Sequence, residues 1–145
     1  MNLNQTTNPK LKETFVTINI LITIGNNEQL FQVHFLTSSI SLIIELIGKA
    51  LDLFNEQKFI FNDEKSKPMF ILKFIIQPDE YELKPSKKNG KPKLDYPPFH
   101  HNSILCETQT QSFSLLFNEN NLKLIKPGKK VDKAQLCRGI SCLIF

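Results

Sequence analysis

The sequence predicts an α+β domain in which one helix packs against one face of a mixed β-sheet. Two patterns support this prediction. Apolar and polar residues alternate in the first part of the chain, as in half-buried strands, and the spacing then changes to that of an amphipathic helix. The chain has 145 residues, 41% of them hydrophobic, which suits one domain with a core. We expect a polar tail over residues 1–13 and one domain over residues 14–145.

The first two strands are expected to form a hairpin. In residues 15–24, Thr17, Asn19 and Thr23 alternate with the aliphatic positions and are expected to face solvent. The aliphatic positions are Val16, Ile18, Ile20, Ile22 and Ile24. The Gly-Asn-Asn sequence at 25–27 tolerates positive φ and supplies a turn before a second strand over residues 31–36.

An amphipathic helix is expected from Ile40 to about Asn55. Hydroxyl side chains at residues 37–39 are candidate N-caps. Gly48 lowers helix propensity by up to about 1 kcal/mol relative to Ala, so we expect the helix to approach the sheet closely there. The apolar stripe consists of Ile40, Ile43, Ile44, Ile47, Leu51 and Phe54.

The second half of the chain is expected to complete the sheet. The apolar run 69–76 is expected to be a central strand buried on both faces, and prolines in 77–98 predict a long projecting loop without regular structure. Further segments are a loop at 62–68, a strand at 112–117, a polar stretch at 118–133 and a last strand at 140–145. This order of strands and helix is that of the β-grasp, or ubiquitin-like, fold.

Composition disfavours several function classes. The net charge is +4, but basic and acidic residues are mixed, whereas nucleic-acid binding favours a basic stripe. The cysteines Cys106, Cys137 and Cys142 lack the spacing of a zinc site, so we expect no metal and no cofactor. Apolar runs are too short for a spanning helix, so no membrane insertion is expected. We expect a cytoplasmic protein, with recruitment to the plasma membrane as part of a complex left open.

No pattern typical of an enzyme is present. The sequence has no nucleophile elbow, dinucleotide fingerprint or phosphate loop. His34, His100 and His101 have no nucleophile or carboxylate at a recognisable spacing, so we interpret them as polar surface residues. We therefore expect a binding domain and not an enzyme.

Three segments together resemble one known family. They are residues 20–30 (a strand and turn), the Glu-Leu-Ile-Gly step at 45–48, and the Asp-Tyr-Pro-Pro segment that begins at Asp95 and leads to Phe-Ser-Leu-Leu at 113–116. In order and spacing they resemble the CRIM domain of the stress-activated-kinase-interacting proteins, the substrate-recruiting subunit of TOR complex 2. The resemblance covers roughly residues 15–117.

The resemblance implies a non-catalytic, ubiquitin-like adaptor. Such a domain binds AGC-family protein kinases of the Akt, SGK and PKC type and presents them for phosphorylation, with other TOR complex 2 subunits as further partners. Binding in that family is partly through an acidic projecting loop, which corresponds to residues 77–98 here. The candidate protein-binding residues are Asp79, Glu80, Glu82, Asp95, Tyr96 and Phe99.

This loop departs from the family in its charge. It contains four acids and five lysines, so its net charge is about +1. Three of the acids gather at its start, and the lysines are Lys84, Lys87, Lys88, Lys91 and Lys93. The acids are either a contact surface for a basic kinase or ordinary solvated charges. The lysines are either a surface for anionic groups or a solvated flexible loop, the reading we favour. Residues 96–99 are either a platform for a partner or, as we favour, an anchor that holds the loop to the core.

A second class of function is also compatible with a ubiquitin-like fold. Small-GTPase-binding modules of this fold add the edge of their second strand to the sheet of the GTPase, with basic side chains facing an acidic surface. The predicted second strand, residues 31–36, contains no Lys or Arg, which disfavours this alternative.

Overall fold

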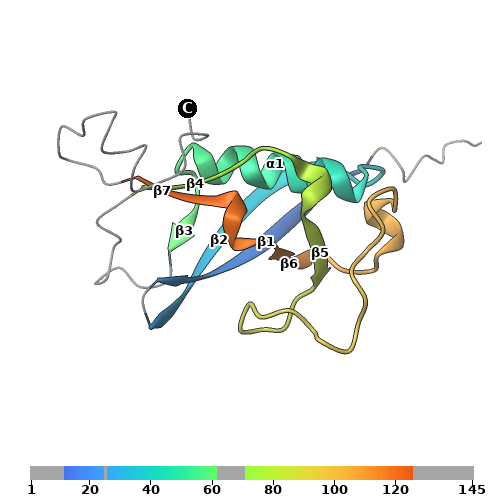
Figure 1. Cartoon of the computed structure of the whole chain (residues 1–145). Coiled ribbons are helices and arrows are strands. Elements are labelled where there is room, and N and C mark those ends of the chain that lie inside the picture. The colour runs from blue at the N-terminus through green and yellow to red at the C-terminus, as the bar shows by residue number, and fades with distance from the viewer. Residues whose placement is uncertain (1–11, 25, 62–70, 126–145) are drawn as a thin grey trace, which may run out of the picture.

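A computed structural model describes residues 12–24, 26–61 and 71–125. In these residues, helix α1 (Ile43–Asn55) packs on one face of a mixed five-stranded sheet, and a two-stranded sheet lies beside the helix (Figure 1). The α+β prediction is therefore confirmed. The strands are β1 (Glu13–Ile24), β2 (Asn27–Ser38), β3 (Ile60–Phe61), β4 (Ile71–Phe74), β5 (Glu82–Pro85), β6 (Ser112–Leu116) and β7 (Leu122–Ile125).

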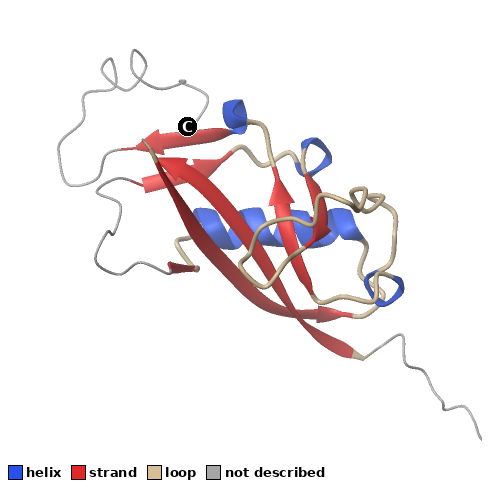
Figure 2. Ribbon diagram, turned by 90° about the horizontal axis from the view of Figure 1, so that it is seen from below, coloured by secondary structure: helices blue, strands red, loops and turns tan. Residues whose placement is uncertain are grey.

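The main sheet has the strand order β3-β2-β1-β6-β5. Its centre is the parallel pair β1–β6, and the pairs β1–β2, β2–β3 and β5–β6 are antiparallel. The helix covers one face, and the chain between β5 and β6 passes over the other face, which is turned towards the viewer in Figure 2. Both faces of the centre are thus removed from water, which a parallel pair usually requires.

The predicted hairpin is confirmed, and its strands are longer than predicted. β1 and β2 have twelve residues each and pair from Ile24↔Asn27 to Glu13↔Ser38. Val16, Ile18, Ile20 and Ile22 are buried against the helix. The prediction that Asn19 faces solvent is wrong: Asn19 is only 2% exposed, because the segment after β5 covers it.

The helix starts three residues later than predicted. Leu42 is the N-cap instead of residues 37–39, and its N–H donates to Glu45 Oε1 at 2.8 Å. Ile40 lies in a turn and is 39% exposed, so its assignment to the core stripe is wrong. The N–H groups of Ile43 and Ile44 donate to the carbonyl oxygens of Ser103 and His101 at 2.9 and 3.0 Å. A distant backbone segment therefore satisfies donors that no side-chain cap reaches.

Aromatic residues hold the helix to the two sheets. The Phe54 ring lies 5.5 Å from Phe31, 4.8 Å from Phe59 and 4.9 Å from Phe74, between centroids. Asn55, at the end of the helix, accepts from the N–H of Phe74 at 2.8 Å and donates to its carbonyl at 2.9 Å. These contacts fix β4 against the helix.

The prediction of a central strand at 69–76 is wrong. Ile71–Phe74 forms β4, which in the described part of the chain pairs only with β7 and lies outside the main sheet. Leu72 and Phe74 are buried while Ile71 and Lys73 are half-buried, so β4 has one buried face instead of two. Strand β7 falls in the stretch predicted to be polar, and its four residues were too short a pattern to detect.

The prediction that residues 77–98 form a loop without regular structure is wrong for residues 78–85 and confirmed for residues 86–98, which contain no helix or strand. The segment begins with the 3-10 helix η4 (Pro78–Glu80) and continues into β5, an edge strand of the main sheet. Pro85 ends β5, a position where its missing N–H is tolerated. The predicted loop at 62–68 and the predicted last strand at 140–145 lie outside the described residues.

Gly48 approaches a turn and not the sheet. A Cβ added at Gly48 would lie 3.5 Å from Pro78 Cγ in η4, which is ordinary van der Waals contact. The expectation of a close approach to the sheet is therefore wrong.

No helix in the described ranges is long and apolar enough to cross a bilayer.

Candidate functional site

Four exposed carboxylates lie on three adjoining segments, η4, the start of β5 and η6, and we call Asp79, Glu80, Glu82 and Glu119 the acidic corner. Asp79 and Glu80 lie in η4, and Glu82 is the first residue of β5. Glu119 lies in the 3-10 helix η6 (Glu119–Asn121), which contacts η4 through a 3.2 Å hydrogen bond from Asn121 Nδ2 to Glu80 Oε1. The sequence predicts the first three acids as site residues but not Glu119, because no sequence pattern links residues so far apart.

The charges of the acidic corner have no basic partner within the described ranges. The ion pairs found there are Lys58–Glu56 at 3.2 Å and Lys91–Glu28 at 3.5 Å, both elsewhere. Carboxylates that no ion pair neutralises give a surface a negative potential, which Lys84, two residues after Glu82 on β5, reduces but does not cancel. This corner is therefore suited to a basic partner.

Tyr81 holds the backbone of the acidic corner in place. It lies between Glu80 and Glu82, is fully buried, and donates from its hydroxyl to the carbonyl of Ile75 at 2.6 Å. Its ring packs edge-on against Phe74 with centroids 5.8 Å apart. Burial raises the pKa of the Tyr81 phenol well above its ordinary value, and the negative charge of Glu80 raises it further.

Asp95 and Tyr96 lie away from the acidic corner. The N–H of Lys93 donates to the carbonyl of Pro85 at 2.9 Å, so Asp95 follows the end of β5 that is opposite Glu82. Tyr96 is 54% exposed, with Lys93 Nζ 5.5 Å from its ring centroid. The structure therefore does not bring these two predicted residues together with the first three.

Phe99 has the anchoring role that the sequence analysis favoured. Its ring packs edge-on against Phe113, with centroids 5.6 Å apart, and its N–H donates to the carbonyl of Leu83 at 2.8 Å. Two residues later, His101 Nε2 lies 2.6 Å from the carbonyl oxygen of Tyr81. Residues 93–101 thus run back along β5 and cover its outer edge, which protects the edge from pairing with another chain.

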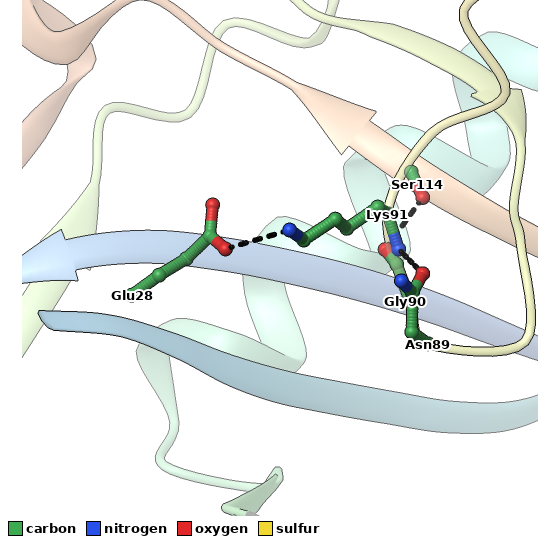
Figure 3. A network of polar contacts seen from close by, with 5 residues as sticks. All are labelled: Glu28, Asn89, Gly90, Lys91 and Ser114. Atoms are coloured by element: carbon green, nitrogen blue, oxygen red, sulfur yellow. Dashed lines mark hydrogen bonds and ion pairs between the residues drawn. The ribbon is translucent and has the colours of Figure 1, made fainter.

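Three of the five lysines of the predicted loop belong to a segment that passes over the face of the main sheet away from helix α1. This segment is residues 86–92, which we call the lysine hairpin, closed by the bridge Ser86↔Pro92. A 2.8 Å hydrogen bond from Ser114 Oγ to the carbonyl of Gly90 fixes the hairpin to the sheet, and Lys91 also forms a half-exposed ion pair with Glu28 (Figure 3). The nearly balanced charge of residues 77–98 therefore separates in space into an acidic corner and a basic hairpin.

A buried polar cluster lies beneath the lysine hairpin. Asn19 Nδ2 donates towards Ser86 Oγ and the carbonyl of Phe113, at 3.0 and 3.1 Å, and Asn19 Oδ1 accepts from Gln32 at 2.7 Å. Buried amides need such partners, because an unpaired one costs about 1–3 kcal/mol. Asn19 was predicted to be a solvent-facing residue, and it instead attaches the hairpin to the sheet.

Neither the described histidines nor the pocket near the start of β1 shows an arrangement typical of catalysis. His34 Nδ1 lies 3.0 Å from Thr17 Oγ1 and His101 contacts a carbonyl, and no cluster in the described ranges has three residues able to hold a metal ion. A pocket of about 520 Å³ lies where β1 begins, with Lys12, Cys106 and Gln109 in its wall. The described wall places no histidine or carboxylate beside the exposed thiol of Cys106.

Comparison with protein-family models, with curated proteins and with solved structures finds no match to this chain. The likeness to the CRIM domain therefore rests on the three sequence segments. Among the surfaces described above, the acidic corner has the largest number of charged side chains of one sign.

Proposed function

We propose that this chain is a non-catalytic adaptor domain with a β-grasp fold. In this proposal it binds AGC-family protein kinases through the acidic corner and presents them for phosphorylation within TOR complex 2. The sequence resemblance suggests the family, and the acidic corner is the observation that supports a basic kinase surface as the partner.

The arrangement of strands supports a β-grasp fold. A parallel pair of strands, β1 and β6, lies at the centre, the N-terminal hairpin lies on one side and β5 lies on the other. The helix follows the hairpin in sequence and crosses one face of the sheet. Folds of this kind serve many functions, so the function must be argued from the site.

The acidic corner suits recruitment because its backbone is already ordered. Tyr81 fixes the chain between Glu80 and Glu82, and Asn121 fixes Glu80 to η6. A preformed surface loses less conformational entropy on binding than a flexible loop does. Negative potential also accelerates encounter with a basic partner, and salt weakens this effect. The proposal thus replaces a projecting acidic loop by a fixed acidic surface.

The alternative of a small-GTPase-binding module has less support. Such a module would need basic side chains along its second strand, and β2 (Asn27–Ser38) contains neither Lys nor Arg. Binding to a GTPase that depends on the bound nucleotide would favour this alternative over the adaptor.

A charge-reversal variant tests the proposal. We would change Asp79, Glu82 and Glu119 to Lys and retain Glu80, because Glu80 accepts the hydrogen bond from Asn121. The matched control reverses three exposed acids outside the corner, Glu13, Glu56 and Glu107, so both variants have the same net charge.

Affinity for purified AGC-kinase catalytic domains would be measured by biolayer interferometry at about 50 mM and about 150 mM salt. We expect the corner variant to lose at least about tenfold in affinity, because three attractive contacts become repulsive. The control variant should bind like the unmodified chain. Equal loss in both variants, or no kinase binding by the unmodified chain, would count against the proposal.

A further inference from the structure

The outer edge of β2 has main-chain groups that point away from the sheet. The N–H of Thr17 donates to the carbonyl of Gln111, on the β6 side, so the pair Thr17↔His34 exchanges no hydrogen bonds between β1 and β2. The N–H of Ser39 donates to the carbonyl of Lys12, which fixes the same alternation along the strand. The N–H and C=O groups of His34 and Leu36 therefore point outwards.

Strand β3 covers only part of this edge. It pairs with β2 at Phe31 and Gln32 and has just two residues. In the described part of the chain, no strand pairs with the outward groups of His34 and Leu36. An unpaired stretch of this kind is a template for an added strand.

The side chains around this edge have different chemistry on the two faces. On the face away from the helix, Leu36 and its neighbour Phe15 on β1 are 55% and 52% exposed, and the Phe15 ring stacks on His34 with centroids 5.5 Å apart. On the helix face, Lys49 is exposed, and its Nζ lies 5.8 Å from the ring centroid of Phe35. The edge therefore has an apolar strip on one face and a cation on the other.

We propose that this edge binds an extended segment of a partner protein in which apolar and acidic side chains alternate. The segment adds a strand to β2 by pairing its main chain with His34 and Leu36. Because side chains alternate along a strand, its apolar residues pack against Leu36 and Phe15 while its acidic residues face Lys49. This surface is separate from the acidic corner, and the inference does not depend on the proposed function.

The charge at the edge favours such a segment over a second copy of this chain. Antiparallel pairing of two β2 edges around Phe35 would place the Lys49 residues of both copies at the same contact. Like charges brought together there disfavour pairing, and lysine near an edge is a common way to prevent it. An acidic segment instead supplies the opposite charge.

The test uses a fluorescein-labelled peptide that alternates glutamate and valine, with binding to the whole chain measured by fluorescence anisotropy. The first control peptide has N-methyl groups on the alternate residues that face β2, which removes its main-chain donors and leaves the protein unchanged. The second control peptide has lysine in place of glutamate. Both controls are expected to bind at least about tenfold more weakly than the parent peptide.

Two substitutions test the two halves of the surface. Leu36→Pro removes one outward N–H without breaking a hydrogen bond of the hairpin, and it should weaken binding at least about tenfold. Lys49→Glu should weaken binding about fivefold at low salt, because an attraction becomes a repulsion. The matched control, Lys88→Glu in the lysine hairpin, makes the same change of net charge and should leave binding unchanged.

Several results would overturn the inference. One is that the N-methylated peptide binds as tightly as the parent peptide. Another is that both single variants, Leu36→Pro and Lys49→Glu, bind the parent peptide as tightly as the unmodified chain does. A third is that the parent peptide does not bind at all. Sedimentation that shows a dimer, made monomeric by Leu36→Pro, would assign the edge to a second copy and also overturn the inference. The charge-reversed acidic corner should still bind the peptide, so failure of one proposal is distinguishable from failure of the other.

Discussion

Replacing Gly90 by alanine tests how the lysine hairpin is fixed to the sheet. A Cβ at Gly90 would lie 2.7 and 2.9 Å from the two methyl carbons of Leu30, well inside contact distance. Gly90 also has φ of +86°, a conformation that costs a residue with a Cβ roughly 1 kcal/mol or more. The overlapping atoms are the ends of the flexible, half-buried Leu30 side chain, so a rotation of that side chain relieves the overlap at a cost of about 0.5–1.5 kcal/mol. Alanine restricts the unfolded chain and returns up to about 1 kcal/mol, so we expect a net loss of roughly 1 kcal/mol.

The matched control is Gly48→Ala in the helix. Its Cβ would make ordinary contact with Pro78 at 3.5 Å, and alanine has the higher helix propensity. We therefore expect Gly48→Ala to raise the free energy of unfolding by about 0.5–1 kcal/mol. The two substitutions change the free energy of unfolding in opposite directions. Gly90 has a positive φ and lies against Leu30, whereas Gly48 lies in a helix with room for a Cβ beside Pro78.

Urea unfolding followed by far-ultraviolet circular dichroism measures both effects. With a slope of about 2 kcal/mol per molar urea, Gly90→Ala should lower the midpoint by roughly 0.5 M. Adding Leu30→Ala to Gly90→Ala should recover the part of the loss that comes from overlap, which appears as coupling in a double-mutant cycle. If Gly90→Ala has the midpoint of the unmodified chain, the hairpin does not pack on Leu30 as described.

Three further predictions concern the buried cluster, the tyrosine and the ion pair. Asn19→Ala should lower the free energy of unfolding by about 2 kcal/mol in urea titrations, because it leaves buried partners unpaired. Tyr81→Phe should cost about 1 kcal/mol at neutral pH. The pKa of Tyr81 is raised in the folded chain, so the tyrosine contributes fully to the free energy of unfolding below the ordinary tyrosine pKa of about 10. This contribution is lost as the pH rises above that value. The stability of Tyr81→Phe should therefore depend less on alkaline pH than that of the unmodified chain. Lys91→Ala should change stability by less than about 0.5 kcal/mol in the same assay, because the Lys91–Glu28 pair is about half exposed, and a larger loss would show that the pair fixes the hairpin.

The sequence predicted the elements whose pattern is long and periodic. The alternation in β1 and the helical stripe ending at Phe54 each extend over ten or more residues, and both elements exist in the structure. The start of the helix was misplaced because Leu42 caps it through the Glu45 side chain and distant carbonyl groups, which local sequence does not show. The run at 69–76 was misassigned because continuous apolar character does not distinguish a central strand from a strand that packs beside a helix.

The candidate site was predictable only where its residues are adjacent in sequence. Asp79, Glu80 and Glu82 were found because they are neighbours, whereas Glu119 joins them only through the packing of η6 on η4. Prolines between 78 and 98 suggested an irregular loop, yet Pro85 ends an edge strand that pairs with β6. The summed charge of residues 77–98 does not describe this surface, because the lysines that follow the acids in sequence lie on another face of the sheet.

The most direct test of the proposed function is to map the kinase contact on the chain itself. Two-dimensional ¹H–¹⁵N nuclear magnetic resonance spectra of the labelled chain would be recorded with increasing amounts of an AGC-kinase catalytic domain. We predict that the amide signals of Asp79–Glu82 and Glu119–Asn121 shift or broaden first, and that about 150 mM salt reduces the effect. Changes confined to other surfaces, or no changes at the acidic corner at any kinase concentration, would contradict the proposal that this corner recruits the kinase.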